Sequence, residues 1–515
     1  MTKFFMSKIQ DVKREHTTAS TPSNRTVALK TAAATDKVIF CQLHYRKIHA
    51  SINLSALSET FAKLKHPSIL GGNSAKKDGG RFSYWAACPK DIFEFRYGQK
   101  DPFAQLEKVL DKYKLEQDPR LKTQDTKSDL PKGIFRGGWV GYFSYELGRY
   151  IEKLPETTID DLQMPLIRLC FYDRFIGYDH LEETFRLIAL QLPEDTENPE
   201  EKLETLEKLL AKSKKRHIPS PPPADIENID FSQIRCNMDK DYYLGMFEKI
   251  KRYIYDGDVY QINFSQRFEC DYNVSPIALF HWQNHYNTSP YAAYIDTGSL
   301  QIVSASPEMF ITIENSIIST KPIKGTRPRV SEGGQSKQIN AKNFDELLFS
   351  EKEKAELNMI VDLERNDIAR ICEPGSRKVV QPRTIETYPT VFHAVATVAG
   401  RLRQEITFCD ILKAMFPGGS ITGAPKIRSM EIIDETEPTA RGVYTGSIGY
   451  IGLDGSVSLN IAIRTIIIKN KIAFAQTGGG IVADSDAEAE WNETLTKARA
   501  LLAGINSVQR TAYSG

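Results

Sequence analysis

The chain has 515 residues, of which 41% are hydrophobic and 26% are charged, a composition typical of a globular protein that buries a large core. Its 67 Lys and Arg residues and 66 Asp and Glu residues leave a formal net charge of +1. A charge this balanced gives no electrostatic footprint for nucleic acid or an anionic membrane, so we expect neither as a partner.

The seven cysteines are scattered along the chain and are never spaced C-x-x-C. An odd and dispersed set is typical of reduced thiols and argues against a disulfide framework or a zinc site. The sequence also has no apolar segment suited to a signal peptide and no run long enough to span a membrane. We therefore expect a cytoplasmic protein.

The first part of the chain divides by composition. Residues 1–36 are rich in Ser, Thr, Lys and Ala without periodicity, which predicts a flexible tail. Residues 37–192 contain short apolar runs separated by Gly and Pro, and these predict strands. A charged stretch with leucines at helical spacing follows, and Pro219–Pro223 predicts a stiff extended linker. We therefore place a domain boundary within residues 193–236.

Residues 237–508 mix helical and strand patterns in no regular alternation, which favours an α+β fold. Apolar stripes at helical spacing, with start and stop signals, predict helices over residues 240–255, 351–370, a stretch after Pro425, and 486–502. Alternating or continuous β-branched runs predict strands over residues 259–264, 444–450, 458–468 and 472–476.

Lys324 lies in the segment Pro322–Thr326, directly after a β-branched run. The following Gly325 predicts that a strand gives way to a turn here, so that the amine can point into a cavity as a nucleophile. For that role its pKa must fall from about 10.4 to near neutrality, which takes roughly 4 kcal/mol of burial or neighbouring charge. A solvated surface lysine is the alternative at this point.

Two of the predicted helices each carry a pair of glutamates three residues apart, Glu353 with Glu356 and Glu490 with Glu493. Residues at i and i+3 share a helix face, so two such faces brought together make a site for a hard cation such as Mg²⁺. The absence of His and Cys nearby argues against zinc. Solvated glutamate pairs on surface helices are the alternative.

Charged and amide side chains crowd the middle of the first of these helices. Either a half-buried salt-bridge cluster that orients the helix or a set of direct ligands explains them equally well. The residues concerned are Asp362, Arg365, Asn366, Asp367 and Arg370.

Two glycine-rich segments and one arginine complete the candidates. Gly418–Lys426 lacks the G-K-[ST] ending of a nucleotide-binding loop, and we predict a turn that feeds a proline-initiated helix, with amides free to meet a carboxylate. Gly478–Gly480 follow a predicted strand, where they either permit close approach of a small anion or form a plain turn. Arg464 lies among apolar strand residues; facing inward, it needs an anion, and a planar carboxylate matches its guanidinium.

Taken together, ordered segments of the chain resemble the chorismate-binding enzymes. The segments are Ser306–Glu308, Pro322–Thr326, Ala355–Glu356 with Ile360–Asp367, Phe416–Lys426, and Glu490–Thr494. The resemblance covers about residues 239–502, and a weaker one to the family's N-terminal region covers residues 39–190. It implies the fold of anthranilate synthase component I, a large mixed β-sandwich decorated by helices, with residues 37–192 as the N-terminal region and 237–508 as the chorismate-binding catalytic domain.

Members of this family differ in what attacks the chorismate ring. Anthranilate and isochorismate synthases carry alanine where this chain has Lys324, whereas the aminodeoxychorismate synthase type carries P-I-K-G-T. Isochorismate- and salicylate-forming members need a lysine base at the position of Gln261, where an amide cannot take a proton. The resemblance therefore implies amination of chorismate to 4-amino-4-deoxychorismate, for p-aminobenzoate and folate synthesis. Anthranilate formation is the alternative, and a non-catalytic tryptophan-binding regulatory subunit is an alternative of another class.

The resemblance also implies roles for individual residues. Lys324 matches the nucleophile and Glu308 the general acid, while Thr326 and His393 match residues close to the leaving group. The residues that match positions binding the substrate carboxylates are Arg464, Tyr444, Gly479, Gly480 and Lys497. Magnesium would be held directly by Glu356 and Glu493, and through water by Glu353 and Glu490.

Two further ligands or partners are implied. The chain has no Cys in the G-x-C-x-G setting of a glutaminase, so ammonia is expected from a separate glutamine amidotransferase subunit, component II. Family members also hold tryptophan in the N-terminal sandwich, although the loop of residues 71–80 here departs from the usual spacing. The positions that match the tryptophan pocket are Ser74, Arg81, Phe82, Pro290, Tyr291 and Ala292.

Overall fold

The computed structural model describes residues 38–72, 80–116, 130–214, 218–223, 229–231, 234–330, 336–388 and 391–513. The predicted tail of residues 1–36 and Ser74 lie outside these ranges. Residues Val38–Gly515 belong to one compact unit. No described helix combines the length and the apolar character that crossing a membrane requires.

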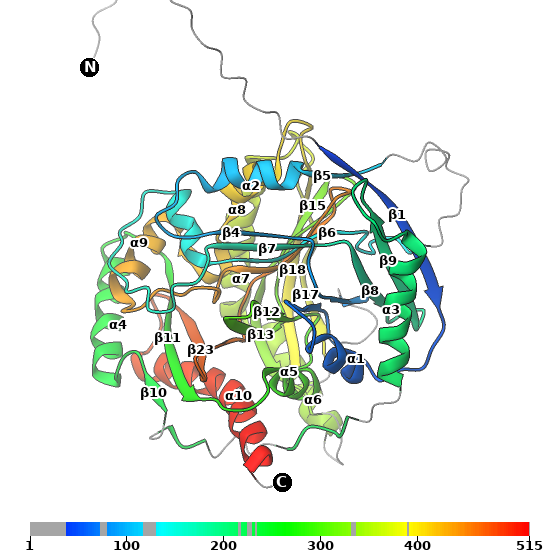
Figure 1. The fold of residues 1–515 in the computed structure, drawn as a ribbon. Helices are drawn as coiled ribbons and strands as arrows, with labels where there is room; N and C mark the ends of the chain where they lie inside the picture. Colours follow the sequence, from blue (N-terminus) through cyan, green and yellow to red (C-terminus); the bar gives the residue numbers. More distant parts are fainter. Residues whose placement is uncertain are drawn as a thin grey trace, which may run out of the picture. The chain divides into compact units, whose positions relative to one another are not determined.

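The described strands form two sheets (Figure 1). In the thirteen-stranded sheet the order is β10 (Arg235–Cys236), β11 (Gln261–Asp271), β23 (Ile472–Ile481), β22 (Thr465–Lys469), β13 (Leu300–Ser306), β12 (Tyr291–Asp296), β2 (Ser68–Leu70), β3 (Phe82–Ala86), β8 (Arg174–Asp179), β9 (Thr184–Gln191), β1 (Ile39–Ile48) and β5 (Tyr113–Leu115), with β19 (Gly423–Ala424) paired to β11. Its pairs are antiparallel apart from β1 with β5.

The second sheet has ten strands, all paired antiparallel. Their order is β16 (Ile323–Pro328), β18 (Val391–Arg401), β15 (Ile317–Lys321), β14 (Met309–Glu314), β21 (Val457–Asn460), β20 (Ser447–Gly452), β6 (Gly138–Phe143), β7 (Ile167–Tyr172) and β4 (Asp91–Phe95), with β17 (Lys378–Thr387) paired to β18. Strand β16 is therefore an edge strand of this sheet.

The two sheets contribute residues to common hydrophobic clusters. In the largest cluster, Ile262 and Phe264 of β11 pack with Phe310 of β14 and Ile318 of β15. Because these strands belong to different sheets, the sheets pack face to face. The predicted α+β sandwich is confirmed.

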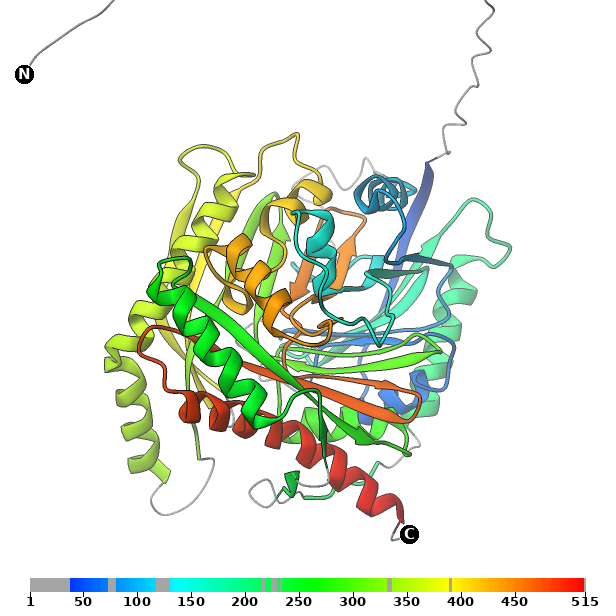
Figure 2. The same cartoon turned by 90° about the vertical axis from the view of Figure 1, so that its left-hand side faces the viewer.

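Helices surround the sheets (Figure 1). They are α1 (Leu54–Phe61), α2 (Pro102–Asp111), α3 (Pro199–Lys214), α4 (Lys240–Tyr255), α5 (Pro276–Tyr286), α6 (Ser336–Phe349), α7 (Glu351–Ala369), α8 (Phe408–Met415), α9 (Lys426–Thr436) and α10 (Ala487–Tyr513), with short 3-10 turns η2 (Tyr145–Tyr150) and η4 (Gly419–Ile421). Helix α10 packs along β23 and β11 and against α4, as Figure 2 shows from the side, and α7 packs against β16 and β18.

The boundary that we predicted within residues 193–236 does not separate two domains. Strands from before and after this segment occur in both sheets, and one compact unit includes both parts. The proline segment itself is held in place: the Pro222 carbonyl accepts a hydrogen bond from Trp282 Nε1 at 3.1 Å, and the Pro221 carbonyl accepts one from the Tyr286 hydroxyl at 3.1 Å. It is a docked connection rather than a spacer.

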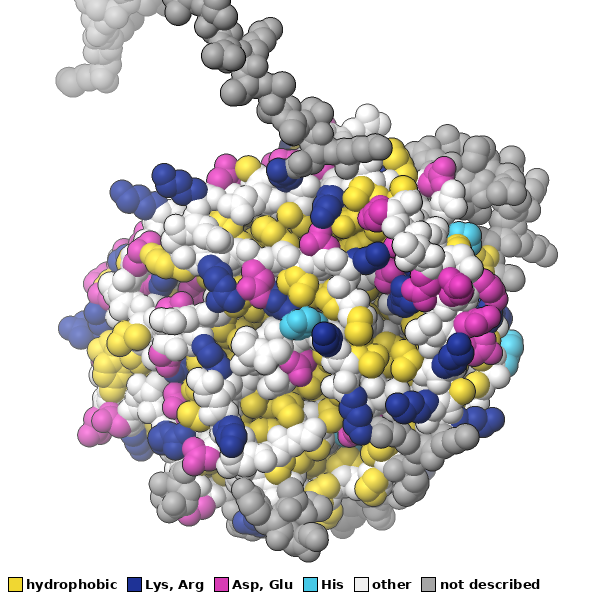
Figure 3. Space-filling view, in the orientation of Figure 1, with side chains coloured by type: hydrophobic (Ala, Val, Ile, Leu, Met, Phe, Trp, Pro, Cys, Tyr) yellow, Lys and Arg dark blue, Asp and Glu magenta, His cyan; other side chains and the backbone are white. Residues whose placement is uncertain are grey.

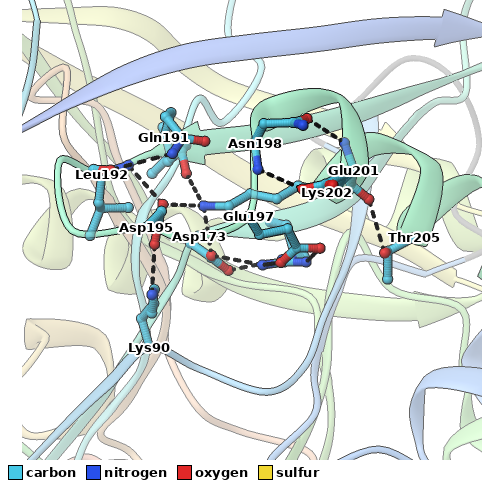
Figure 4. A network of polar contacts seen from close by, with 12 residues as sticks. Lys90, Asp173, Gln191, Leu192, Asp195, Glu197, Asn198, Glu201, Lys202 and Thr205 are labelled. Atoms are coloured by element: carbon cyan, nitrogen blue, oxygen red, sulfur yellow. Dashed lines mark hydrogen bonds and ion pairs between the residues drawn. The ribbon is translucent and has the colours of Figure 1, made fainter.

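Helix α3 is fixed to the larger sheet by a buried ion network, shown in Figure 4. Lys202 is fully buried, forms ion pairs with Asp173 (3.0 Å) and Asp195, and donates to the Leu190 carbonyl at 2.7 Å. Asp195 also pairs with Lys90 at 2.7 Å. A buried ammonium needs several such acceptors, and the network supplies them.

Several predicted elements match the structure, and others do not. Helix α4 has the predicted bounds, with Asp239 capping it by accepting from the Tyr242 amide at 2.8 Å. The strand predicted over residues 458–468 is wrong as one strand, because β21 and β22 belong to different sheets and Arg464, at φ 49°, lies where the chain crosses between them. The glycines 478–480 form neither a turn nor a loop but continue β23.

Positive and negative side chains are interspersed over the face drawn in Figure 3, with no extended region of one sign. This agrees with the balanced net charge of the chain.

Candidate active site

Lys324 lies on the edge strand β16, at a β-bulge rather than at the predicted turn. Ile323 pairs with Val395 and Thr326 with His393, so two residues, Lys324 and Gly325, stand opposite one on β18. Gly325 has φ 95°, a conformation that favours glycine. A Cβ at this position would lie 2.9 Å from the Glu353 carboxyl carbon, so glycine also allows α7 to approach closely. The bulge redirects the lysine, as bulges near functional sites commonly do.

The amine of Lys324 lies among charges from several elements. Burial lowers its pKa from the ordinary value, and the nearby Lys497 ammonium acts in the same direction. The carboxylates of Glu356, Glu308 and Glu493 oppose the shift. The net effect is a lowered pKa, which increases the fraction of neutral, nucleophilic amine.

Glu308 is a buried carboxyl beside this lysine, 3% exposed. Burial raises its pKa, although the Ser420 hydroxyl and the Lys324 ammonium oppose the shift. One carboxyl oxygen accepts a hydrogen bond from the Ile323 amide at 3.4 Å. A carboxyl that keeps its proton at higher pH is suited to act as a general acid.

The glycines of β23 form the wall opposite Lys324. A Cβ at Gly480 would lie 3.5 Å from Lys324 Nζ and 2.9 Å from Gln261 Nε2. At Gly479 it would lie 2.7 Å from a carboxylate oxygen of Glu490. The site is therefore formed where the edge strand of the ten-stranded sheet meets β11 and β23 of the other sheet, and side chains on β23 would fill it.

The four predicted metal ligands come from α7 and α10, which face the same space. The carboxylates of Glu356 and Glu493 both raise the pKa of Lys324 by their charge. The Lys352 ammonium of α7 likewise lowers the pKa of Glu490 and Glu493 of α10. Within the described ranges, no three His, Cys, Asp or Glu side chains form a compact metal-binding group.

The donors fit Mg²⁺ in their chemistry. All are carboxylate oxygens, and Glu353 Oε2 is buried without a hydrogen-bond partner. The remaining carboxylate oxygens are partly engaged: Glu353 with Arg327 (2.8 Å), Glu493 with Lys497 (2.7 Å) and Glu490 with Ser485 (2.7 Å). Burial raises the pKa of Glu493, but the Lys497 and Lys324 ammonium groups outweigh burial and hold this pKa below its usual range. Burial raises the pKa of Glu490.

Arg464 is an unpaired cation in this region. Burial lowers its pKa, and no carboxylate in the part of the chain that the structure describes offsets that shift. Tyr444 is buried at 5% exposure, and burial raises the pKa of its hydroxyl. Lys497 donates to the Gly478 carbonyl at 2.8 Å. A guanidinium without a counter-ion, next to the space between the sheets, calls for an anionic ligand.

His393 and Thr326 face one another across β16 and β18, with Thr326 Oγ1 and His393 Nδ1 2.8 Å apart. Burial, together with the charges of Arg464 and Lys321, lowers the pKa of His393 to about 3. The imidazole is therefore neutral, and its buried Nε2 has no hydrogen-bond partner in the described structure.

Other polar atoms of the same region are also buried without a partner among the described residues. They are Gln261 Oε1 and Nε2, Asn263 Oδ1 and Glu364 Oε2. Such atoms are costly in a folded protein unless water or a ligand satisfies them. Their concentration around Lys324 and Glu308 marks a polar binding site.

Ser420 and Glu364 are two residues of the site that the sequence patterns do not reveal, although they lie in the segments Gly418–Lys426 and Ile360–Asp367. The predicted turn over residues 418–426 is confirmed, and the carboxylate that meets its amides is the chain's own, since the Gly419 amide donates to Glu364 at 3.2 Å. Of the charged residues on α7, Asp367 forms a largely buried pair with Lys426, whereas Asp362 pairs with Arg365 at the surface. The salt-bridge interpretation therefore holds for Asp367.

A cavity of about 390 Å³ lies beside the site. The described residues that we matched to a tryptophan pocket all line it: Arg81, Phe82, Pro290, Tyr291 and Ala292. Met309 and Lys321 form part of its wall. The cavity is large enough for a small ligand and combines apolar walls with a few polar groups.

Comparisons with known proteins agree with this geometry. The family model described as chorismate binding enzyme matches residues 74–503. Aminodeoxychorismate synthase component 1 of Bacillus subtilis (strain 168) is 39% identical over 381 residues, 74% of this chain and 79% of its own length. Anthranilate synthase component 1 of Pseudomonas putida is 36% identical over 422 residues, 80% and 81% of the two chains. The crystal structure of anthranilate synthase component I from Streptococcus pneumoniae TIGR4 superposes with a TM-score of 0.66 at 32% identity, covering 83% of this chain and 93% of that one.

Proposed function

The chain belongs to the chorismate-binding enzyme family, and on that premise we propose that it is the chorismate-aminating component of an aminodeoxychorismate synthase. Its product would be 4-amino-4-deoxychorismate, the precursor of p-aminobenzoate. Relatives named for this activity and for anthranilate synthesis have similar identity to the chain. Overall similarity therefore does not choose between the two reactions.

The observation that carries the choice is Lys324. It is a lysine with a lowered pKa, placed by a bulge beside the buried acid Glu308. Anthranilate formation needs no amine nucleophile from the protein at this position. A buried lysine with a lowered pKa at this position is explained by amination through a lysine nucleophile.

In the proposed reaction the neutral amine of Lys324 attacks the chorismate ring with allylic displacement of the ring hydroxyl. A carbon–nitrogen bond forms, the carbon–oxygen bond breaks, and the hydroxyl leaves as water with the proton of Glu308. Ammonia then attacks, the bond to Lys324 breaks, and the lysine amine is released neutral. The product ammonium returns one proton to the site, which restores Glu308.

The substrate carboxylates would be bound by Arg464, by Tyr444 and by the backbone amides of Gly479 and Gly480, with Lys497 nearby. The unpaired guanidinium of Arg464 supports this assignment. Neutral His393, held by Thr326, would offer its free Nε2 near the departing hydroxyl. These residues orient the ring and do not themselves form bonds with it.

Magnesium would be held by Glu356 and Glu493 directly, and by Glu353 and Glu490 through water. When bound, it offsets the negative charge of the ring carboxylate. The all-carboxylate donor set supports magnesium rather than a softer metal.

A partner subunit and a small-molecule ligand complete the proposal. A glutamine amidotransferase subunit would supply ammonia, which the relatives' designation as component 1 supports. Tryptophan would occupy the 390 Å³ cavity lined by Arg81, Phe82 and Tyr291. A rise in the unfolding temperature on adding tryptophan, but not alanine, would support that occupant.

The proposed function is tested by the product. The purified chain is mixed with chorismate, Mg²⁺ and an ammonium salt. The products are then separated and identified by mass spectrometry. We expect 4-amino-4-deoxychorismate without fluorescent anthranilate. Anthranilate as the main product would make the chain an anthranilate synthase component, and consumption of no chorismate would support a non-catalytic subunit.

A further inference from the structure

Glu437 and Arg441 form a buried ion pair that none of the roles above includes. They lie just after α9, in the segment leading to Tyr444, and their exposed fractions are 3% and 2%. Arg441 Nε donates to Glu437 Oε2 at 2.8 Å, and Nη2 donates to Oε1 at 2.6 Å. Such a bidentate pair has a fixed geometry that a lysine cannot reproduce.

All five N–H groups of the Arg441 guanidinium are engaged. Besides the two bonds to Glu437, Nη2 donates to the Asn263 carbonyl at 2.7 Å. Nη1 donates to the Ile421 carbonyl at 3.1 Å and to Thr445 Oγ1 at 3.3 Å. The side chain thus joins three segments that are far apart in the sequence: β11, the η4 loop and the turn before β20.

Each of these partners adjoins a residue of the candidate site. Asn263 pairs with Gly480 in the β11–β23 ladder. Ile421 follows Ser420, whose hydroxyl acts on Glu308. Thr445 follows Tyr444 and has φ 59°, a strained conformation for a β-branched residue that its neighbours must hold in place.

Glu437 adds further hydrogen bonds between this ion pair and β11. Its Oε1 accepts from the Ser265 amide at 2.9 Å and from the Ser265 hydroxyl at 2.7 Å, and Ser265 pairs with Gly478. The Arg441 guanidinium also lies 4.7 Å from the ring centre of Tyr145 and 6.0 Å from that of Tyr444. The pair therefore contacts the backbone or ring of residues on three walls of the site.

We propose that the Glu437–Arg441 pair is a positioning device for the chorismate site. It sets the distance between the β23 glycines, the loop that carries Ser420, and Tyr444, without touching the substrate. A buried ion pair is a weak source of stability compared with apolar packing, so its value here is the geometry that five directed hydrogen bonds impose. The inference rests on the proposed function, because it assumes that these walls bind chorismate.

The test is Arg441→Lys, which keeps the positive charge but cannot reach Glu437, Ile421 and Asn263 together. Steady-state kinetics follow the loss of chorismate, so the result does not depend on which product forms. We expect the KM for chorismate to rise about tenfold or more, since small displacements of binding groups are costly, while the KM for ammonium stays unchanged. Loss of folded protein alone would lower kcat and leave the KM for chorismate as it was.

A matched control is Arg149→Lys. Arg149 is a largely buried arginine that pairs with Asp434 of α9 and donates to Thr158 at 2.6 Å. Among the described residues, its hydrogen bonds and ion pairs do not include Asn263, Ile421 or Thr445. This control is expected to lose stability and to keep the wild-type KM for chorismate. An equal rise in KM for both variants would overturn the proposal, because a general loosening of the fold would then explain it.

A second variant covers the case in which Arg441→Lys does not fold. Glu437→Gln keeps the size of the side chain and one acceptor oxygen, and we expect a smaller rise in the KM for chorismate. A wild-type KM in the folded variants, or failure of both variants to fold, would make the pair a stability element and refute the positioning role. A wild-type protein that consumes no chorismate would instead contradict the proposed function, and with it this inference.

Discussion

The position of the Lys324 amine depends on two neighbours that lack side chains. Gly325 lets the strand bulge and lets the Glu353 carboxylate approach, and Gly480 leaves room for the amine on the opposite wall. Burial and the Lys497 ammonium lower the pKa of Lys324 while three carboxylates oppose the shift. The lysine is therefore confined and its pKa is lowered, which suits an amine that must attack and then leave.

At the same scale, the metal assignment predicts the effect of removing single charges. Glu356→Gln and Glu493→Gln should each lower kcat/KM for chorismate by about 100-fold and raise the Mg²⁺ concentration needed for half-maximal activity, because an amide is a poorer ligand. The stabilisation of the protein by chorismate in thermal unfolding should also lose its dependence on Mg²⁺.

The control for these variants is Glu488→Gln, an exposed residue of α10 that pairs with Lys240 at 2.8 Å. It should behave as wild type in both measurements. A double Glu356→Gln, Glu493→Gln variant that remains active and still requires magnesium would remove these residues as ligands.

Among the elements, α3 illustrates how a buried charge fixes a helix to a sheet. Lys202→Met should lower the free energy of unfolding by roughly 3 to 5 kcal/mol, because it leaves Asp173 and Asp195 as buried carboxylates without that partner. Lys208→Met on the same helix, where the side chain is 78% exposed, should change it by less than about 1 kcal/mol. Urea denaturation of both variants measures the difference, and equal effects would contradict the importance of the network.

The short turn η2 carries a buried carboxyl whose protonation is linked to folding. Burial raises the pKa of Glu146 from 4.5 to about 7. A proton bound more tightly in the folded state stabilises it below pH 4.5, and this contribution is lost as the pH rises through 7. The shift corresponds to roughly 3 kcal/mol at most.

Glu146→Gln removes the titrating group, so it should cost more stability at pH 5 than at pH 8, by roughly 2 to 3 kcal/mol. Comparing the denaturation of wild type and variant at the two pH values cancels the contributions of other groups, including Glu364. A cost that is the same at both values, or larger at pH 8, would show that the folded protein does not hold this proton.

Much of the fold followed from local signals. The apolar stripe and the Asp239 cap are local sequence features that define α4, and Pro425 marks the start of α9. The split between β21 and β22 was not predicted. The pattern of a continuous apolar run does not show whether its residues belong to one sheet or are divided between two. Likewise, nothing local distinguishes a glycine that ends a strand from Gly479 and Gly480, which stay in the strand to leave room for side chains across the site.

The site residues themselves came from resemblance more than from pattern. Spacing alone left Glu353, Glu356, Glu490 and Glu493 open between a hard-cation site and solvated surface pairs. The structure brings their helices to one space through packing that no spacing encodes. No local pattern marks Arg441 for the same reason, since the four residues that accept its five hydrogen bonds are spread from Asn263 to Thr445.

For the whole molecule, the proposal predicts the source of nitrogen. The chain lacks the cysteine setting of a glutaminase, so the isolated protein should form product with ammonium and none with glutamine at equal concentration. Adding a glutamine amidotransferase subunit of an aminodeoxychorismate synthase should restore activity with glutamine, as measured by product mass with amide-labelled glutamine. Glutamine-dependent product from the isolated chain would contradict the requirement for a partner.

The most direct test of the account is the product formed by Lys324→Ala from chorismate and ammonium, compared with wild type and with Lys354→Ala, an exposed lysine of α7. We predict that Lys324→Ala loses aminodeoxychorismate formation by about 100-fold or more, while it still binds chorismate, and that Lys354→Ala retains the wild-type rate. Full retention of aminodeoxychorismate formation by Lys324→Ala would contradict the assignment of this lysine as the nucleophile.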